Sequence, residues 1–295
     1  MTAPVLADAL GPRARRRVLI ASIAAGIVLV AVLVAALQRL SDKGQLEWAK
    51  WKPLTDPDVL RFLLGGLANT LKAAGAGMAL ALVIGTLLAL LRLSRSAVVR
   101  LLATAWVELF RGVPLVLLIF FTFFGLPKYS IDINPFRALV LALALYNGAV
   151  LGEIFRAGIL SLDRGQTEAA YAVGLGYWQA MRSVIIPQAA RRMIPAIVSQ
   201  LITLLKDTSL GYVITYEELL RRSRSTGEFF KNPLQVTVFV ALLYIAVNFT
   251  LSRVAHRLEV RQRRRLGAGA IAVAGSEDLA AVGIAAEATV RQEGS

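Results

Sequence analysis

An uninterrupted apolar stretch of twenty residues near the start of the chain places the strongest constraint on its fold. Residues 18–37 contain no charged side chain. As an α-helix rising about 1.5 Å per residue, this stretch would be about 30 Å long, which matches the hydrocarbon core of a bilayer. A cleaved signal peptide is the competing interpretation, but the stretch is too long and lacks a clear small-residue cleavage site before Gln38. We therefore expect a retained membrane-spanning helix.

Further apolar stretches predict five more spans. The chain has 295 residues, of which 57% are hydrophobic, and this proportion argues against a water-soluble surface. Glycine, proline or a charge interrupts several stretches, which bilayer helices tolerate when neighbouring groups satisfy the freed polar atoms. We expect an all-α polytopic membrane protein of about six transmembrane helices. The five additional spans are residues 63–91, 101–124, 138–159, 193–212 and 233–251.

The distribution of basic residues predicts the orientation of these helices. With a cytoplasmic N-terminus, the inside segments hold 18 Lys and Arg residues and the outside segments hold 12. Because cytoplasmic loops carry the excess of basic residues, both termini should be cytoplasmic. The formal net charge of +14 also raises the possibility of nucleic-acid binding. Since the basic residues flank predicted spans, we instead expect contacts with anionic membrane lipids and no nucleic-acid partner.

The composition excludes several classes of enzyme. The chain has no cysteine and a single histidine, His256, which leaves no parts for cysteine-based metal sites or histidine-based triads. A phosphate-binding run of the form G-x-x-x-x-G-K-[ST] is also missing from the sequence. We expect no metal site, no cofactor held by this chain and no catalytic residue. We expect His256 to be solvated.

The longest predicted cytoplasmic loop, residues 160–192, is the most informative part of the chain. Residues 166–173 are good helix formers, and Gly174 and Gly176 then permit a turn. Residues 177–186 resume helical spacing, and Pro187 is expected to stop that helix. Trp178, Met181 and Ile185 share one face of this second helix. This apolar stripe either packs under the helices of the chain itself or inserts into a groove of a partner.

The spacing within this loop resembles the EAA motif of permease subunits in bacterial ABC importers. The residues that carry the resemblance are Glu168, Ala169, Ala170, Gly174 and, after nine residues, Val184 to Pro187. The resemblance implies that this loop is a coupling helix that docks on a cytoplasmic ATPase subunit. The residues assigned to ATPase coupling are Glu168, Ala169, Ala170, Gly174, Trp178, Arg182 and Pro187.

The resemblance extends over about residues 61–257 and is to the polar amino-acid branch of these permeases. The similar segments are GLANTLKAA (66–74), ELFRGVPLVLLIFFTFFGLP (108–127), GEIFRAGILSLDRGQTEAA (152–170) and KDTSL (206–210). This resemblance implies a type I ABC importer permease fold in a bacterial cytoplasmic membrane. The implied partners are an ATPase homodimer that binds ATP-Mg, a second permease subunit or a copy of this one, and an extracytoplasmic amino-acid-binding protein. The N-terminal segment RLSDKGQLEWAKW (39–51) is similar to actinobacterial glutamate permeases, which makes glutamate the favoured substrate.

Ionisable residues inside predicted spans are candidates for functional roles, because a charge near the centre of a membrane costs about 3 kcal/mol. Glu108 and Arg111 lie three residues apart before Pro114. They either form an internal ion pair that fixes helix packing or, for Arg111, line the substrate route and bind a carboxylate. Glu153 and Arg156 repeat this spacing just before the coupling loop, where we expect a structural or transmission role.

Other polar residues of the spans are assigned to the candidate substrate pathway. Asn147 precedes the Glu153 pair by one to two helical turns. Lys206 and Asp207 lie deep in their predicted span and, as helix neighbours, cannot satisfy one another. Thr208 and Ser209 can bond to the backbone and loosen the helix, so a substrate site and a hinge are both open interpretations.

Residues at the predicted outer interface have a simpler interpretation as membrane anchors. Lys72 can extend towards the headgroups, and Trp48, Trp51, Phe62 and Tyr129 suit an aromatic belt.

The sequence thus predicts four segments and one principal function. The segments are a basic cytoplasmic N-terminus (1–17), a first helix with an outer loop (18–60), a permease domain (61–258) containing the coupling loop (160–192), and a basic, then Ala/Gly-rich disordered tail (259–295). The expected function is ATP-driven import of a polar amino acid, with glutamine, aspartate or a basic amino acid as alternatives to glutamate. An ion-gradient-driven carrier and a membrane scaffold or receptor without transport are the competing functions.

Overall fold

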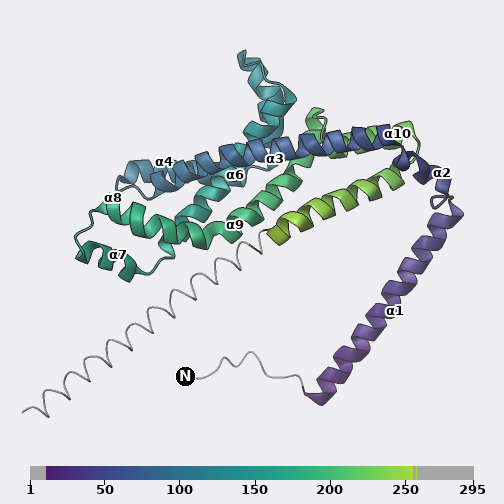
Figure 1. Cartoon of the computed structure of the whole chain (residues 1–295), viewed down its shortest axis with the longest axis horizontal. Coiled ribbons are helices and arrows are strands. Elements are labelled where there is room, and N and C mark those ends of the chain that lie inside the picture. The colour runs from purple at the N-terminus through teal and green to yellow at the C-terminus, as the bar shows by residue number, and fades with distance from the viewer. Residues whose placement is uncertain (1–10, 255–256, 258–295) are drawn as a thin grey trace, which may run out of the picture.

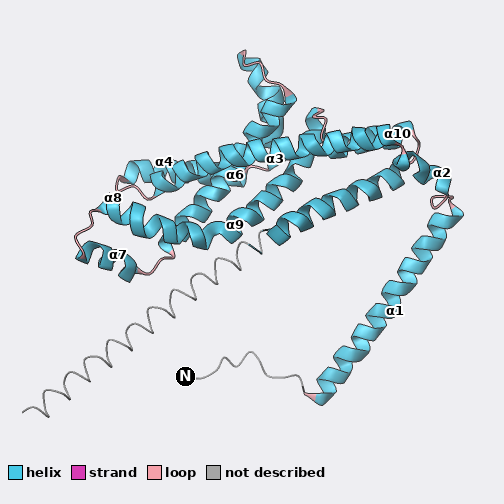
Figure 2. Ribbon diagram, viewed as in Figure 1, coloured by secondary structure: helices cyan, strands magenta, loops and turns pink. Residues whose placement is uncertain are grey.

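The computed structural model describes residues 11–254 and 257, and this part of the chain is built from helices without strands (Figure 2). The predicted disordered tail and His256 lie outside the described residues. In chain order the elements are α1 (Pro12–Asp42), α2 (Trp48–Trp51), η2 (Lys52–Thr55), α3 (Pro57–Arg92), α4 (Ala97–Gly112), α5 (Leu115–Phe120), η3 (Phe121–Gly125), η4 (Leu126–Tyr129), α6 (Pro135–Leu160), α7 (Arg164–Ala172), α8 (Tyr177–Ala180), η5 (Met181–Ile185), α9 (Ile186–Asp207), η6 (Thr208–Ile214), α10 (Leu219–Phe229) and a last helix (Pro233–Val254).

Four of the described helices are long and apolar enough to cross a membrane, namely α1, α3, α6 and the last helix. A fifth span results if α4 and the bent segment Leu115–Tyr129 are taken together. The predicted span 193–212 does form a helix, α9, but α9 carries Arg191, Arg192, Lys206 and Asp207 and does not meet the same criterion. The all-helical, polytopic architecture is confirmed, with four or five such spans where the sequence predicts six.

Helix α1 stands apart from the other helices (Figure 1). Its most apolar window has no buried residue, so its side chains are free to face lipid around the whole helix. The segment after it is tied to the last helix. Gln235 Nε2 donates to the carbonyl oxygen of Gln45 at 2.5 Å, and Asn232 Nδ2 donates to that of Lys50 at 2.7 Å. The last helix and the residue before it therefore hold the first half of the α1–α3 connection.

The centre of the bundle is the contact between α3 and α6, where small residues bring the two backbones together. A Cβ atom placed on Gly85 would lie 2.7 Å from Leu151 Cβ and 3.1 Å from the carbonyl oxygen of Gly148. One placed on Gly148 would lie 2.7 Å from Ile84 Cγ2. Because small residues allow membrane helices to approach closely, these glycines set the separation of α3 and α6.

The predicted helix 101–124 is wrong in one respect, because the structure breaks it at Val113 and Pro114. Helix α4 ends at Gly112, and the following helical segment, Leu115–Tyr129, departs from it at 99°. Val113 is extended, with φ −83° and ψ 128°. A residue before proline is pushed out of the helical region, and this restriction explains the bend.

We predict that Gly85→Ala lowers the free energy of unfolding by about 1–3 kcal/mol, since the added methyl group overpacks the α3–α6 contact. Gly75→Ala is the matched control on the same helix, because a Cβ there meets no atom within 4 Å. Thermal unfolding of the two variants in detergent measures the difference. Equal stability of the two variants would show that the close approach at Gly85 does not hold the helices together.

Candidate functional site

The predicted coupling loop forms a helical elbow at one end of the bundle, where α7 and α8 lie (Figure 1). Helix α7 starts at Asp163, whose Oδ1 accepts a hydrogen bond from the backbone N–H of Gly165 at 2.9 Å. The carboxylate caps the helix and satisfies one of its free N–H groups. Of the motif residues on α7, Glu168 and Ala169 are exposed and Ala170 is buried. The start of the motif is therefore accessible from outside the chain.

Gly174 makes the turn of the elbow in a left-handed conformation, with φ +81°. The backbone N–H of Gly174 donates to the carbonyl oxygen of Tyr171 at 2.9 Å, and that of Leu175 donates to Ala170 at 3.2 Å. This pair of bonds is a Schellman motif, which closes the end of α7. A Cβ on Gly174 would meet no atom within 4 Å, so the backbone conformation alone requires glycine here. The predicted turn at Gly174 is confirmed.

The apolar stripe of the second helix is divided between the bundle and the outside. Ile185 is buried and Met181 is half-buried, and both contact the hydrophobic core. Trp178, in contrast, is 74% exposed, and Val173 in the turn is 76% exposed. Exposed apolar side chains grouped on one tip are typical of a protein–protein contact surface. The inner half of the stripe thus packs within the chain, and the outer half is free to contact a partner.

The prediction that Pro187 stops this helix is wrong. Residues 181–185 form a π-helical turn between α8 and α9, and Pro187 lies in the first turn of α9 without ending the helix. Proline lacks the N–H group that an α-helix would use at this position, and the wider π turn accommodates the loss. The backbone is consequently helical from Tyr177 to Asp207, so the second arm of the elbow and α9 are continuous.

Three side-chain contacts hold the elbow in place. Gln188 Nε2 on α9 donates to Gln166 Oε1 on α7 at 3.0 Å, and Arg192 Nη1 donates to the carbonyl oxygen of Ser161 at 2.9 Å. The guanidinium of Arg95, in the α3–α4 turn, lies 5.6 Å from the centre of the Tyr177 ring. The first arm of the elbow, α7, and its second arm, α8 with η5, are therefore both bonded to the bundle. A displacement of the tip would accordingly move α6 and α9. Arg182 is exposed on the second arm.

Glu153 joins α6 to α3 just above the elbow. Its carboxylate forms an ion pair with Arg156 on the same helix, at 2.6 Å, and with Arg92 at the end of α3. Sequence analysis predicts the first partner and misses Arg92, which is mostly buried and lies 61 residues away. In the sequence, Arg92 lies at the predicted cytoplasmic end of a span. This position indicates how the span is oriented, but it does not indicate that Glu153 is the partner of Arg92. The Arg92–Glu153 bond links α3 to α6 at the end of this helix pair nearest the elbow, and Arg156 adds a second charged partner from α6 itself.

Glu108 and Arg111 lie on the surface of this chain, at the end of α4. Their closest charged atoms are 4.0 Å apart, and the side chains are 65% and 41% exposed. A pair this long and open contributes little to packing within the chain. Charges in a membrane bundle face water or another protein, so this position suits an aqueous route or a subunit interface.

Asn147 is fully buried between α6 and α9. Its Nδ2 donates to the carbonyl oxygen of Leu143 at 2.9 Å, and its Oδ1 accepts a hydrogen bond from Gln200 Nε2 at 2.6 Å. Sequence analysis does not identify Gln200, because nothing in the local pattern indicates which helix faces Asn147. These two bonds give Asn147 a packing role in the structure, and its place in the substrate pathway stays a prediction.

The end of α9 changes its winding where the sequence predicts a loosened helix. Thr208 Oγ1 donates to the carbonyl oxygen of Leu205 and Ser209 Oγ donates to that of Lys206, each at 2.7 Å. From Thr208 the chain forms the 3-10 helix η6. Both hydroxyl groups satisfy carbonyl oxygens that the α-helix leaves free at its end. Lys206 is exposed, and Asp207 is partly buried.

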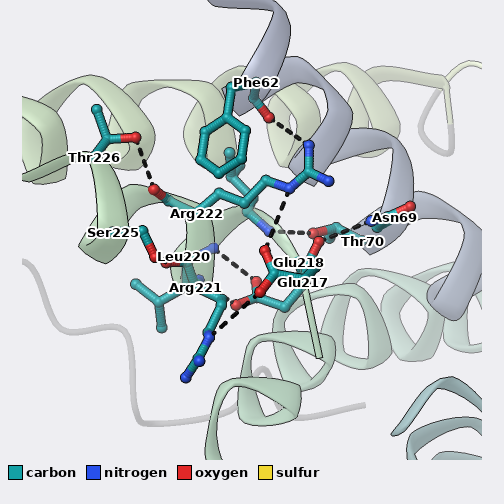
Figure 3. A network of polar contacts seen from close by, with 11 residues as sticks. Phe62, Asn69, Thr70, Glu217, Glu218, Leu220, Arg221, Arg222, Ser225 and Thr226 are labelled. Atoms are coloured by element: carbon teal, nitrogen blue, oxygen red, sulfur yellow. Dashed lines mark hydrogen bonds and ion pairs between the residues drawn. The ribbon is translucent and has the colours of Figure 1, made fainter. Parts of the chain in front are cut away.

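A polar cluster that the sequence does not predict lies beside α10, at the opposite end of the bundle from the elbow (Figure 1), and Figure 3 shows its side chains. Its centre is Glu218, a fully buried carboxyl group that caps α10. Around it, Asn69 and Thr70 of α3 bond to the backbone of residues 217 and 219. The Glu217–Glu218 pair ahead of a helical stretch is the one signal in the sequence that could have indicated a cap.

Comparison with known proteins identifies the family of the chain. Residues 81–264 match the model of the binding-protein-dependent transport system inner membrane component. The chain belongs to this family. As a permease, it is the membrane component of an ABC importer, which works with an ATPase and a substrate-binding protein.

Several relatives of this permease are named for amino acids. It is 39% identical to the glutamate transport system permease protein GluD of Corynebacterium glutamicum over 234 residues, which cover 78% of this chain and 84% of the relative. It is 42% identical to the probable glutamine ABC transporter permease protein GlnP of Bacillus subtilis over 209 residues, which cover 69% and 94%. The resemblance to polar amino-acid permeases is thus confirmed.

A solved structure confirms the permease fold. The crystal structure of an amino acid ABC transporter with histidines aligns with a TM-score of 0.66 at 31% identity, over 68% of this chain and 94% of that chain. An inward-facing methionine ABC transporter, MetNI, aligns with a TM-score of 0.57 at 20% identity, over 69% and 99%. The second likeness concerns the fold alone.

We predict that Arg92 and Glu153 are energetically coupled by about 1–2 kcal/mol in a double-mutant cycle, because the guanidinium is largely buried against the carboxylate. Thermal unfolding of Arg92→Gln, Glu153→Gln and the double variant measures the coupling. The exposed Asp58–Arg61 pair, whose side chains are more than four-fifths accessible, is the control and should show a coupling near zero. Independent effects at Arg92 and Glu153 would contradict the prediction.

Proposed function

We propose that this permease imports a polar amino acid across the cytoplasmic membrane of a bacterium, with glutamate favoured over glutamine, aspartate and basic amino acids. The support comes from relatives whose names specify glutamate, glutamine and, for ArtQ of Bacillus subtilis, arginine. In this proposal the binding protein carries most of the substrate selection, which is consistent with the wide range of these names. The family assignment disfavours the gradient-driven carrier as an alternative.

The elbow at Gly174 is the observation that carries the coupling mechanism. Its exposed tip, with Trp178 and Val173, is suited to a groove on an ATPase subunit. Its second arm is continuous with α9, and its first arm is fastened to α9 by Gln166. Closure of an ATPase dimer would move the tip, and the packed helices would carry that displacement into the membrane. ATP-Mg is bound by the ATPase homodimer in this proposal, and this chain supplies no catalytic residue.

A second permease subunit and an extracytoplasmic binding protein complete the proposed importer. The exposed Glu108–Arg111 pair supports a covering subunit or a shared aqueous route, because charged groups do not face lipid without cost. In this arrangement both termini and the elbow are cytoplasmic, and α10 lies on the extracytoplasmic side. The candidate pathway residues Arg111, Lys206 and Asp207 would then face the route between the two permease subunits.

We predict that Gly174→Ala reduces amino-acid uptake and ATPase stimulation at least several-fold, while Gly176→Ala leaves both near the original level. Gly174 has a positive φ that alanine adopts only with strain, whereas Gly176 has φ −70° and room for a Cβ.

Glu168→Lys and Gly174→Pro should abolish both uptake and ATPase stimulation without affecting membrane insertion. Uptake by the reconstituted complex and its ATP hydrolysis are the measurements. Normal transport by the Gly174 and Glu168 variants would contradict docking through the elbow.

We predict that Arg111→Ala raises the substrate concentration needed for uptake of carboxylate-bearing amino acids by about tenfold, through loss of a bidentate contact. Arg111→Lys should recover part of the loss because it keeps the charge. Arg61→Ala, at an arginine that is 81% exposed, is the control. If substrate-dependent ATP hydrolysis by the Arg111→Ala complex is unchanged, Arg111 does not line the route.

A further inference from the structure

Glu218 is a buried carboxyl group that makes hydrogen bonds to two elements of the fold. Its Oε1 accepts from the backbone N–H of Arg221 at 2.6 Å, and its Oε2 accepts from that of Leu220 at 2.8 Å. The hydroxyl of Tyr244, on the last helix, donates to Oε2 at 3.1 Å. Among residues 11–254, no lysine or arginine forms an ion pair with this carboxyl group. Burial of an ionised carboxyl group without a counter-charge costs free energy, which the hydrogen bonds to Glu218 offset in part.

The neighbours of Glu218 fasten α10 to α3 (Figure 3). Thr70 Oγ1 accepts a hydrogen bond from the backbone N–H of Leu219 at 3.2 Å, and Asn69 Nδ2 donates to the carbonyl oxygen of Glu217 at 2.8 Å. One turn further on, Arg222 Nη1 donates to the carbonyl oxygen of Phe62 at 2.7 Å and stacks over its ring at 4.6 Å. The corner formed by α3, α10 and the last helix is thus closed by these polar bonds together with a buried apolar cluster that contains Leu63, Leu219 and Val236.

Both ends of α10 carry a residue in a conformation that favours glycine. Thr215, three residues before Glu218, has φ +62°, and Lys231, just after α10, has φ +55°. A β-branched residue such as threonine is a rare outlier in this region, and such strain persists only where the surrounding structure enforces it. Thr215 and Lys231 thus lie on either side of α10.

We propose that Glu218 is a positioning residue for transport, whose buried carboxyl group latches the start of α10 to the last helix beside the backbone bonds that join α10 to α3, and that the latch opens during the transport cycle and exposes Glu218 to water. This inference rests on the proposed importer function. The latch lies at the end of the bundle opposite the elbow (Figure 1). A rigid displacement that enters at the elbow would reach α10 through α3 and the last helix.

Protonation of Glu218 makes the opening of the latch depend on pH. Burial raises the pKa of Glu218 to about 7, and neighbouring Glu217 raises it further, whereas the N–H groups of residues 220 and 221 and the Tyr244 hydroxyl act against the rise. Burial also raises the pKa of Tyr216, so this neighbour stays protonated. Exposure would return Glu218 to its ordinary pKa of 4.5. Glu218 therefore binds its proton more tightly when the latch is closed than when it is open.

This difference favours the closed latch in acid and the open latch in alkali. Below pH 4.5, Glu218 is protonated in both the closed and the open latch, and the stabilisation of the closed latch is fully present. This stabilisation is lost as the pH rises through about 7. For these two pKa values, the equilibrium constant for opening rises about tenfold between pH 6 and pH 8. Replacement of Glu218 by a residue that does not titrate should abolish the pH dependence.

Cysteine labelling of the complete permease tests the latch directly, because the chain contains no cysteine. Ser223→Cys places a thiol on α10 where the native side chain is 3% exposed, and Ser225→Cys places one on the same helix where the side chain is exposed. Both thiols react faster with maleimide as the pH rises, and the ratio of the two labelling rates cancels this shared effect. We expect this ratio to rise about tenfold from pH 6 to pH 8.

Three further substitutions decide whether Glu218 causes the rise. In the Glu218→Gln background the ratio should be independent of pH, and in the Glu228→Gln background, at an exposed carboxylate of the same helix, the rise should persist. Tyr244→Phe removes a hydrogen bond that lowers the pKa of Glu218, so the pH at which the ratio levels off should move upwards. A ratio that does not change with pH in the otherwise native chain, or a rise that survives Glu218→Gln, would overturn the proposal.

The transport assay separates this inference from the proposed function. In the reconstituted importer, ATP should increase the Ser223→Cys labelling ratio, and Glu218→Gln should flatten the pH profile of amino-acid uptake. Uptake that keeps its pH profile in Glu218→Gln, while Gly174→Ala still uncouples the ATPase, would reject the latch and leave the proposed function intact. An importer that transports no amino acid would reject the proposed function, whereas the labelling experiment would still report on the latch.

Discussion

The close contact between α3 and α6 is the constraint on which the rest of the structure depends. Gly85 and Gly148 remove the side chains that would separate the two helices, and neighbouring alanines keep the contact narrow. In lipid, helix association gains little from apolar burial, because the tails are as apolar as the side chains, so close packing must supply the attraction. The position of this pair fixes where Arg92 meets Glu153 at one end and where Thr70 meets α10 at the other.

From this pair, a continuous set of contacts leads to the elbow. Asn147 on α6 bonds to Gln200 on α9, and α9 is helically continuous with the arm that carries Trp178. A polar bond buried between two helices resists sliding, because separating the partners would leave two buried polar groups unsatisfied. The π turn at residues 181–185 matters here, since a helix that stopped at Pro187 would leave the elbow on a flexible joint. The elbow is thus suited to transmit a displacement as well as to bind.

The parts of this fold that follow from local pattern could be predicted from the sequence, and the parts that depend on pairing between distant segments could not. The apolar stretches, the turn at Gly174 and the loosened helix after Lys206 are local, because each depends on the chemistry of a few consecutive residues. Pro187 does not stop its helix because a π turn accommodates the missing N–H, whereas Pro114 bends the chain because it holds the preceding residue, Val113, in an extended conformation. Arg92, Gln200 and Glu218 act through partners 26 to 61 residues away, which no local spacing reveals.

The two ends of the bundle differ in a way that suits a transporter driven from one side. At the elbow, two of the fastening contacts join long side chains to a side-chain amide and to a backbone carbonyl oxygen. At α10, the fastening depends on a carboxyl group that titrates near neutrality and on two strained residues. The elbow, in contrast, is helically continuous with α9. If the proposed latch opens during transport, a displacement imposed at the elbow would move α9 as a unit and would be taken up at α10, where opening depends on the protonation of Glu218.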